Sequence, residues 1–483
     1  MKSFITTAVL LACISMSLAA VINVPGDSTT IQAGINGAVT GDTVLVASGT
    51  YYENLNYNGK DIVLTSVAGP EHTIIDGSSN GAVVLIVSGE SNAAVLDGFT
   101  IQHGSGSPSL NDPDKKFGGG ICLRYDSSPR LSNLIVTNNK ALGFEASGGG
   151  IGVSLGSEPI IENVIISHNE SYHGGGLYSY FAAPILKNMK IHDNYASSGG
   201  GGAGFHNSTP KINNISVYDN YADDYAGGLW FYDKSMAVLN ALTIYGNTSR
   251  ISGGGIWTLG NNSIYLINSI CRGNAPNQIT SFVSSVYQPG VIGIAYSDIE
   301  GGELGLSLAS GELTLWEDNI DIDPEFTNVD LRDFTLSPGS PCIDAGIGSY
   351  VVGPEVLIEL SPDEYAGTAP DMGACESTHE SSGIKLTDPR PYEIVLHQNY
   401  PNPFNPSTQI TYSLKNPSPV RLDIFTIRGK HVTTLVDNIE PIGVHKQVWD
   451  GSDYKGLQVE SGIYIYRLTA SDEIQTRTML LIR

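Results

Sequence analysis

The sequence predicts an all-β fold in which repeated coils of parallel strands stack into a solenoid, followed by a small immunoglobulin-like β-sandwich. Three observations predict this fold class. A repeat of about 26 residues runs from 118 to 274, and apolar residues alternate with polar ones inside each repeat. Residues 392–483 contain short alternating strands separated by turn residues. A content of 56 Gly and 24 Pro in 483 residues favours short strands over long helices.

Glycines and asparagines mark the repeat. A Gly-Gly pair followed by a mostly apolar residue opens each unit, at 119–120, 149–150, 175–176, 201–202, 227–228 and 254–255. An asparagine closes each unit: Asn139, Asn169, Asn194, Asn220, Asn247 and Asn274. Six residues earlier stand Asn133, Asn163, Asn188, Asn214, Ala241 and Asn268. One unit cannot bury its own apolar face, so copies must stack, with asparagine over asparagine and hydrogen bonds between their amides. Glycine is expected to supply corner backbone angles that other residues resist.

With these marks the chain resembles the right-handed parallel β-helix proteins of the pectate-lyase-like superfamily, over roughly residues 22–375. The resemblance implies a solenoid over 21–290 with an N-terminal cap. The runs 42–47, 61–66, 82–88 and 95–102 are predicted to form further coils. Ile31, Ile35 and Val39 recur every fourth residue, which predicts a short helix over the open end of the stack.

The acidic stretch 291–375, whose single cation is Arg332, is predicted to form irregular closing coils, and 376–391 a linker. Its Cys342 and Cys375 lie in one irregular segment. Export would permit a disulfide between them, and the sequence leaves that pairing open.

The two ends of the chain predict export. Residues 1–20 are typical of a signal peptide, with Lys2, an apolar run from 4 to 18 and a small-residue cleavage site, although Cys13 also permits a lipoprotein signal. Residues 392–483, with the motif Tyr400-Pro401-Asn402-Pro403-Phe404 and a later Trp449-Asp450-Gly451, resemble the C-terminal sorting domain of the type IX secretion system. The resemblance implies passage through the outer-membrane secretion machinery to the cell surface or beyond. A generic immunoglobulin-like stalk is the alternative.

Charge excludes one class of partner. Residues 385–483 hold 11 Lys+Arg and 10 Asp+Glu, which leaves 14 of the 25 cations and 39 of the 49 acids for residues 1–384. A surface this negative repels phosphate backbones, so nucleic acid is not expected to bind. No stretch after the first 20 residues is predicted to be a transmembrane helix.

Aromatic residues after the Gly-Gly marks predict a ligand-binding face. Alternation sends two columns of side chains outward there, and these contain Tyr178, Tyr180, His206, Trp230, Tyr232 and Trp257. Stacked rings suit the faces of sugars, so we expect a polysaccharide-binding platform. Packing of these rings under a loop is the alternative.

The loop before each Gly-Gly mark borders the same face and carries candidate catalytic residues, namely Glu145, His173, Asp223, Asp224 and Arg250. A lyase needs a base and a cation beside the sugar carboxylate, and a hydrolase needs paired carboxylates. A row of solvated loop residues is the simpler interpretation. The catalytic arrangements of pectate lyases and polygalacturonases are missing, so the resemblance predicts the fold and not an activity.

Asp321 and Asp323 alternate on one face of the acidic stretch, which predicts a possible calcium site or a solvated acidic loop. Taken together, the sequence predicts an exported surface protein that binds polysaccharide or another extracellular partner without catalysis. A polysaccharide lyase or glycoside hydrolase remains the alternative.

Overall fold

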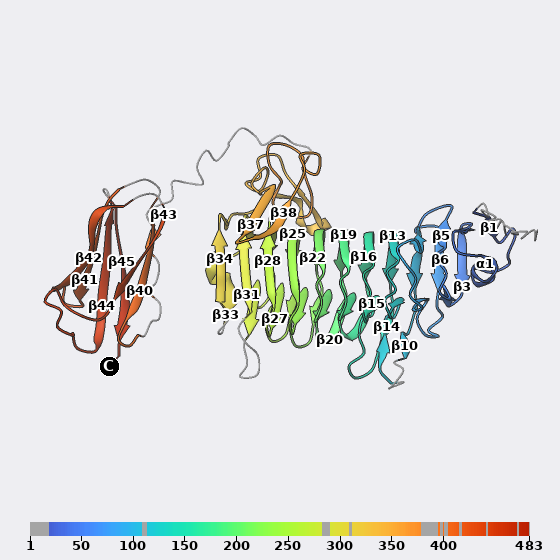
Figure 1. Cartoon of the computed structure of the whole chain (residues 1–483), viewed down its shortest axis with the longest axis horizontal. Helices are drawn as coiled ribbons and strands as arrows, with labels where there is room; N and C mark the ends of the chain where they lie inside the picture. The colour runs from blue at the N-terminus through green and yellow to red at the C-terminus, as the bar shows by residue number, and fades with distance from the viewer. Residues whose placement is uncertain are drawn as a thin grey trace, which may run out of the picture. The chain divides into compact units, whose positions relative to one another are not determined.

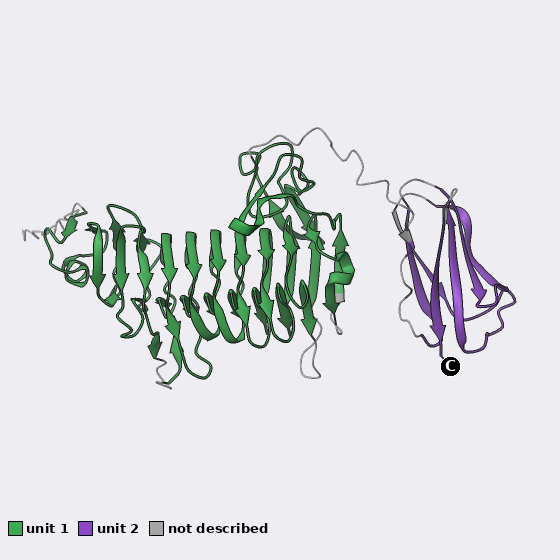
Figure 2. Cartoon of the chain, turned by 180° about the vertical axis from the view of Figure 1, so that it is seen from behind, with its two compact units in different colours: residues 1–382 green, residues 383–483 purple. Residues whose placement is uncertain are grey.

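The computed structural model describes residues 19–108, 114–282, 290–308, 312–377, 395–396, 399, 404–414, 418–440, 443–470 and 473–482. The chain divides into two compact units, residues 1–382 and 383–483 (Figure 2). Residues 1–18 of the predicted signal peptide and residues 378–391 of the predicted linker lie outside the described residues.

The first unit is a parallel β-helix whose strands stack in register from coil to coil (Figure 1). Within the described residues, one wall is a ten-stranded parallel sheet that begins each coil after the Gly-Gly mark. Its strands are β4 (Leu55–Asn56), β7 (Val84–Ile86), β12 (Ile121–Leu123), β15 (Ile151–Ser154), β18 (Leu177–Tyr180), β21 (Ala203–His206), β24 (Leu229–Tyr232), β27 (Ile256–Leu259), β30 (Ile279–Phe282) and β33 (Leu306–Leu308).

The other walls follow the same register. The largest sheet contains β1 (Val21–Val24), β2 (Thr43–Val46), β3 (Gly49–Tyr52), β5 (Val63–Ser66), β6 (Thr73–Asp76), β8 (Val95–Asp97), β9 (Thr100–Gln102), β13 (Arg130–Thr137), β16 (Ile160–Ser167), β19 (Ile185–His192), β22 (Lys211–Tyr218), β25 (Met236–Tyr245), β28 (Ser263–Ile267), β29 (Ile270–Arg272), β31 (Val291–Ala295), β32 (Asp298–Ile299) and β34 (Glu312–Glu317). A short third sheet contains β14 (Lys140–Ala141), β17 (Glu170–His173), β20 (Tyr195–Gly199), β23 (Tyr221–Ala222) and β26 (Thr248–Ser249).

The predicted inward positions form one continuous core. Leu177, Leu229 and Ile256 are fully or almost fully buried in it, as are Leu134 and Val136 of β13. Because each coil buries its apolar side against the next, the repeat period and the strand alternation reinforce each other.

The paired glycines are required mainly by space, and not by corner backbone angles as expected. A Cβ added to Gly149 would lie 2.4 Å from the carbonyl oxygen of Gly175, and one added to Gly227 would lie 2.5 Å from the amide of Thr248. The left-handed backbone falls one residue earlier, for example at Gly148 with φ +69°. The coils therefore approach too closely at the marks for any side chain.

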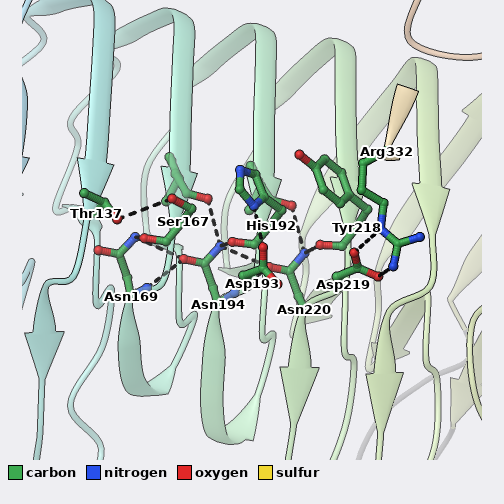
Figure 3. A network of polar contacts seen from close by, with 12 residues as sticks. Thr137, Ser167, Asn169, His192, Asp193, Asn194, Tyr218, Asp219, Asn220 and Arg332 are labelled. Atoms are coloured by element: carbon green, nitrogen blue, oxygen red, sulfur yellow. Dashed lines mark hydrogen bonds and ion pairs between the residues drawn. The ribbon is translucent and has the colours of Figure 1, made fainter. Parts of the chain in front are cut away.

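The closing asparagines form the expected ladder (Figure 3). Each Nδ2 donates to the Oδ1 of the next coil, at 3.1 Å from Asn139 to Asn169 and 3.0 Å from Asn169 to Asn194. The same Oδ1 atoms also accept backbone amides, as in Asn139 N to Asn169 Oδ1 at 3.0 Å. The ladder continues to Asn274, which donates to Gln278 Oε1 at 2.8 Å. These buried amides are thus satisfied by their copies above and below.

The second asparagine column marks a left-handed corner. Asn188 and Asn214 have φ of 52° and 55°, and Ala241 takes the same corner at 56°. Asparagine tolerates this conformation better than other residues with a side chain, which explains the column.

A short helix caps the first coils. Helix α1 (Ile31–Gly37) buries Ile31 and Ile35, and the Thr30 hydroxyl accepts the amide of Ala33. The carboxylate of Glu53 accepts two further amides at the helix start. Lys60 Nζ donates to three carbonyls at its end. Val39, expected on the same helix face, lies beyond the helix and is exposed.

Past the last coils the chain folds back over the flank of the solenoid. This segment, 318–377, contains 3-10 helix η2 (Val329–Leu331) and the hairpins β35 (Phe326–Asn328) with β36 (Asp333–Leu336) and β37 (Ser349–Val352) with β38 (Glu355–Glu359). A second 3-10 helix, η1 (Gly302–Gly305), precedes β33.

The segment is anchored by polar and aromatic contacts. Arg332 Nη2 donates to Asp219 Oδ1 at 2.9 Å, with a second ion-pair contact between the same two side chains (Figure 3). Phe334 packs on the rings of Tyr218 and Tyr245. The four cysteines among the described residues, including Cys342 of this segment, are free thiols.

The second unit is a small antiparallel β-sandwich. One sheet contains β39 (Val395–Leu396), β40 (Thr408–Leu414) and β43 (Gly443–Trp449). The other contains β41 (Ser418–Thr426), β42 (His431–Glu440), β44 (Gly462–Ala470) and β45 (Glu473–Leu481). Their inner faces enclose a separate core that includes Tyr412, Trp449 and Tyr466. No helix of the described residues is long and apolar enough to span a membrane.

Candidate ligand-binding groove

The largest predicted platform residues lie outside the solenoid core but are covered. Tyr178, Trp230 and Trp257 are only 5%, 8% and 5% exposed, and they form an aromatic cluster of their own. The ring of His173 lies 4.9 Å from that of Trp230, and the ring of Tyr225 lies 4.7 Å from that of Trp257, centroid to centroid. His173, in β17, and Tyr225 therefore cover these rings.

Glycines in the same outward column explain why the rings lie flat. A Cβ added to Gly204 would lie 2.9 Å from the ring of Tyr178 and 3.3 Å from that of Trp230. One added to Gly152 would lie 2.5 Å from the ring of Phe117. Each missing side chain gives a neighbouring aromatic ring room to fold down onto the sheet.

The second outward column remains accessible. Tyr180, His206 and Tyr232 are half-buried and contact one another edge to face, with centroid distances of 5.0 Å and 4.7 Å on the two sides of His206. The hydroxyl of Tyr178 lies 3.3 Å from His206 Nδ1. This column therefore contributes partly exposed tyrosine and histidine rings to the face.

An open groove of about 520 Å³ lies over β15, where the outward side chains are small. Ligand sites commonly have volumes of about 300–1,000 Å³. The groove is lined by Lys115, Lys116, Phe117, Arg124, Tyr125, Glu145, Ser147, Ser154, Leu155, His173, Tyr178, Tyr180 and His206.

One wall of the groove is a protruding hairpin, β10 (Ser107–Pro108) with β11 (Lys116–Phe117). The guanidinium of Arg124 stacks over the Phe117 ring at 4.6 Å and donates to the carbonyl of Pro108 at 3.2 Å. These contacts fix the position of the cation before any ligand arrives.

Exposed rings flank the groove. Tyr125, in the lining, is 37% exposed, and Phe144, next to Glu145, is 73% exposed. Phe181 is 49% exposed and packs edge to face on Tyr180. Exposed aromatic side chains around a polar groove are typical of a binding surface.

The histidines of the groove are neutral at pH 7. Burial lowers the pKa of His173 to about 4, and burial also lowers the pKa of His206. A neutral imidazole offers one donor and one acceptor, which suits hydroxyl groups of a ligand.

The candidate catalytic residues Asp223, Asp224 and Arg250 form hydrogen bonds or ion pairs with neighbouring side chains. The Tyr195 hydroxyl donates to Asp223 at 2.6 Å, and Arg250 pairs with Asp224 at 3.4 Å. None of these lines the groove. Glu145 does, and it pairs with Lys115.

The two carboxylates predicted to hold calcium have protein donors as partners. Asp321 accepts Arg272 Nη1 at 3.1 Å, and Asp323 accepts the amide of Glu325 at 2.9 Å. In the part of the chain that the structure describes, no group of three or more His, Cys, Asp or Glu side chains is arranged to hold a metal ion.

Sequence reasoning missed the cationic wall formed by Lys115, Lys116 and Arg124. It also missed the position of the groove over Gly152 and Ser154. Small residues in an otherwise aromatic outward column were the available signal, because Gly152 leaves room for the Phe117 ring that lines the groove.

Comparisons with known proteins agree with this architecture. Residues 71–288 match the family described as "Right handed beta helix region", and residues 398–483 match the "Secretion system C-terminal sorting domain". No curated protein matches the chain.

Three solved structures are similar to the chain at low sequence identity and low TM-score. They are a pectin methylesterase from carrot (14% identity, 64% of this chain and 91% of that one, TM-score 0.31), the full-length tailspike protein 2 of Escherichia coli O157:H7 bacteriophage CAB120 (11%, 96% and 68%, 0.39) and the receptor binding domain of the Siphovirus 9NA tailspike (11%, 95% and 98%, 0.22).

The sorting domain has a direct consequence for location. It indicates export through the type IX secretion system to the cell surface or the surroundings, and it implies interaction with the secretion machinery. The chain is thus an exported right-handed β-helix protein that carries a C-terminal secretion-system sorting domain.

Proposed function

We propose that this exported protein binds an extracellular polysaccharide in the groove over β15, without cleaving it. The observation that carries the proposal is the groove itself, an open space of about 520 Å³ with polar ring edges on one wall and exposed rings around it. Tyrosine and neutral histidine provide hydrogen bonds to sugar hydroxyls, and ring faces provide apolar contact.

The proposed ligand position differs from the platform predicted from the sequence, because it does not include Trp230 and Trp257. Trp230 and Trp257 are covered and do not line the groove, while Tyr178, Tyr180 and His206 are the members of the predicted platform that line it. Tyr232 extends the same column by one coil.

The carboxylates of the groove argue against cleavage by hydrolysis. Among the described residues that line the groove, Glu145 is the single carboxylate, and Lys115 is paired with it. Hydrolysis of a glycosidic bond ordinarily uses two carboxyl groups on opposite sides of the bond.

The test combines a glycan array with an assay for new reducing ends and unsaturated products. We expect retention of glycan without new products. Tyr180→Ala should weaken binding by about 1–3 kcal/mol, equal to roughly fivefold to 150-fold, because a stacking and hydrogen-bonding ring is removed. Tyr52→Ala, at an exposed tyrosine in β3, is the matched control and should bind normally. Absence of any retained glycan, or release of products, would contradict the proposal.

A further inference from the structure

We infer that the chain is cut between Ala19 and Ala20 during export, and that the new α-ammonium group of Ala20 forms an ion pair with Asp42 in the first coil. This inference is independent of the proposed glycan binding. It comes from the hydrogen bonds that hold the start of the solenoid together.

Within the described residues, Ala20 is the first residue that hydrogen-bonds to the rest of the solenoid. Its amide donates to Asp42 Oδ1 at 2.8 Å, and its carbonyl accepts the amide of Thr43 at 2.8 Å. Strand β1 begins at the next residue, Val21, which pairs with Thr43 of β2. The fold therefore holds the nitrogen of Ala20 against a carboxylate.

Asp42 is a buried carboxylate whose partners are neutral. It lies between helix α1 and strand β2, at the N-terminal end of the solenoid (Figure 1), and is 5% exposed. Its second oxygen, Oδ2, accepts the amide of Val39 at 2.9 Å. The hydrogen bonds from Val39 and Ala20 lower the pKa of Asp42, so it is charged at neutral pH. A carboxylate this buried usually has a cationic partner.

The other charged side chains of the first coils have partners of their own. Lys60 Nζ donates to three carbonyls at the end of α1. The Asp61 carboxylate accepts the amide and the hydroxyl of Ser91, and Glu53 accepts two amides at the start of α1. The nitrogen that lies 2.8 Å from Asp42 is that of Ala20, so cleavage before Ala20 would place a cation there.

The sequence favours the same bond. A signal-peptidase site has small residues one and three positions before the cut, and a cut after Ala19 places Ala19 and Ser17 there. A cut after Ala20 would place Leu18 at the third position and would remove the nitrogen that Asp42 binds.

Hydrolysis changes the donor at Asp42. One water is added across the Ala19–Ala20 bond, which leaves a carboxylate on Ala19 and an amine on Ala20 that takes up a proton at neutral pH. The single N–H of the uncleaved chain becomes a charged donor with three N–H groups, and hydrogen bonds to a charged donor are stronger. The first coil is thus expected to be more stable after cleavage than before it.

The first experiment identifies the N-terminus of the exported protein by mass spectrometry of its N-terminal peptide. We expect the chain to begin at Ala20. Any other first residue, such as Val21 or a lipid-modified Cys13, would overturn the inference.

The second experiment compares three chains that all run to Arg483 and begin at Ala19, Ala20 or Val21, each released from a leader by a protease that leaves no extra residue. The measurement is hydrogen exchange of the Val39 and Thr43 amides at pH 7. The chain that begins at Ala20 should exchange about fivefold more slowly than the one that begins at Ala19, because a charged donor replaces a neutral one. The chain that begins at Val21 should exchange fastest, since Asp42 and Thr43 each lose a partner.

Asp42→Asn is the control for charge. In this variant the chains that begin at Ala19 and at Ala20 should exchange alike, because the ion pair is absent from both. Equal exchange of these two chains with Asp42 in place, or a difference that persists in Asp42→Asn, would overturn the ion pair. If Asp42→Asn does not fold, the comparison of the two unsubstituted chains still decides.

Discussion

The outward column that follows the Gly-Gly marks is open at one end of the repeat and filled at the other. In β12 and β15 it holds Cys122 and Gly152, and a groove lies above β15. In β24 and β27 it holds Trp230 and Trp257, and their rings are buried against His173 and Tyr225. The backbone is the same in both regions, so the difference comes from side-chain volume. The small residue Gly152 gives room to the ring of Phe117, which lines the groove, whereas the two tryptophans fill their own part of the column.

The largest expected effect, a loss of unfolding free energy, tests whether the coils approach one another equally closely at the Gly-Gly marks of both regions. Gly149→Ala, in the open region, and Gly227→Ala, in the filled region, should each lower the free energy of unfolding by about 3 kcal/mol or more, because each new Cβ meets the next coil at 2.4–2.5 Å. Urea unfolding followed by circular dichroism measures this loss. Gly37→Ala, whose nearest contact is 4.0 Å away, is the control. A large difference between the two variants would contradict a common frame.

The next effect separates packing from binding. Trp230→Ala should cost about 3 kcal/mol of stability, since it leaves a cavity among buried rings, and should leave glycan binding near normal. Tyr180→Ala should do the reverse, with a stability loss below about 1 kcal/mol. Melting curves and binding isotherms on the same two proteins give both values. Strong loss of binding with intact stability in Trp230→Ala would return the ligand to the tryptophans.

His173 joins the two regions and should make their contact sensitive to acid. Burial lowers the pKa of folded His173 to about 4, whereas the unfolded chain takes up the proton near its ordinary pKa of about 6.5. The unfolded state therefore binds more protons between these values, and stability falls as pH drops from about 6.5 toward 4. Relative to His173→Phe, we expect the native protein to lose about 1–3 kcal/mol over this window. Parallel pH profiles would contradict this.

The smallest effect concerns the corner that carries Ala in place of Asn. Ala241 has φ 56°, a conformation that Asn adopts at lower cost. Ala241→Asn should raise the unfolding free energy by less than about 1 kcal/mol, and Asn214→Ala should lower it by a similar amount. Thermal midpoints of the two variants check both signs. A fall in both midpoints would show that packing, and not φ, sets the preference at this corner.

The repeat made the interior predictable, because every inward position recurs with the same neighbours. Asn139 and Asn169 could be aligned from spacing alone, and they bond as expected. The outer face was less predictable because its contacts are not periodic. Whether Trp230 is covered depends on the position of His173, at the end of β17, and on the absence of a side chain at Gly204.

The repeat spacing also could not predict which charged residues line the groove. Lys116 belongs to β11 and Arg124 follows the end of β12, and both line the same groove. The contact between Arg332 and Asp219 spans 113 residues, and no local pattern announces it.

The asparagine ladder also has a beginning and an end. Its first acceptor, Asn139 Oδ1, accepts the backbone amide of Gly104 at 2.9 Å, and from Asn139 onward each amide-to-amide hydrogen bond runs to the following coil. At the far end Gln278 Nε2 donates to Glu300 Oε2 at 2.9 Å, and a carboxylate has no proton to pass on. The chain of side-chain hydrogen bonds therefore ends at Glu300. A duplicated coil placed between Asn139 and Asn194 would leave both terminal groups and the anchor of Arg332 on Asp219 unchanged, so this part of the solenoid is free to lengthen in whole steps of about 4.8 Å.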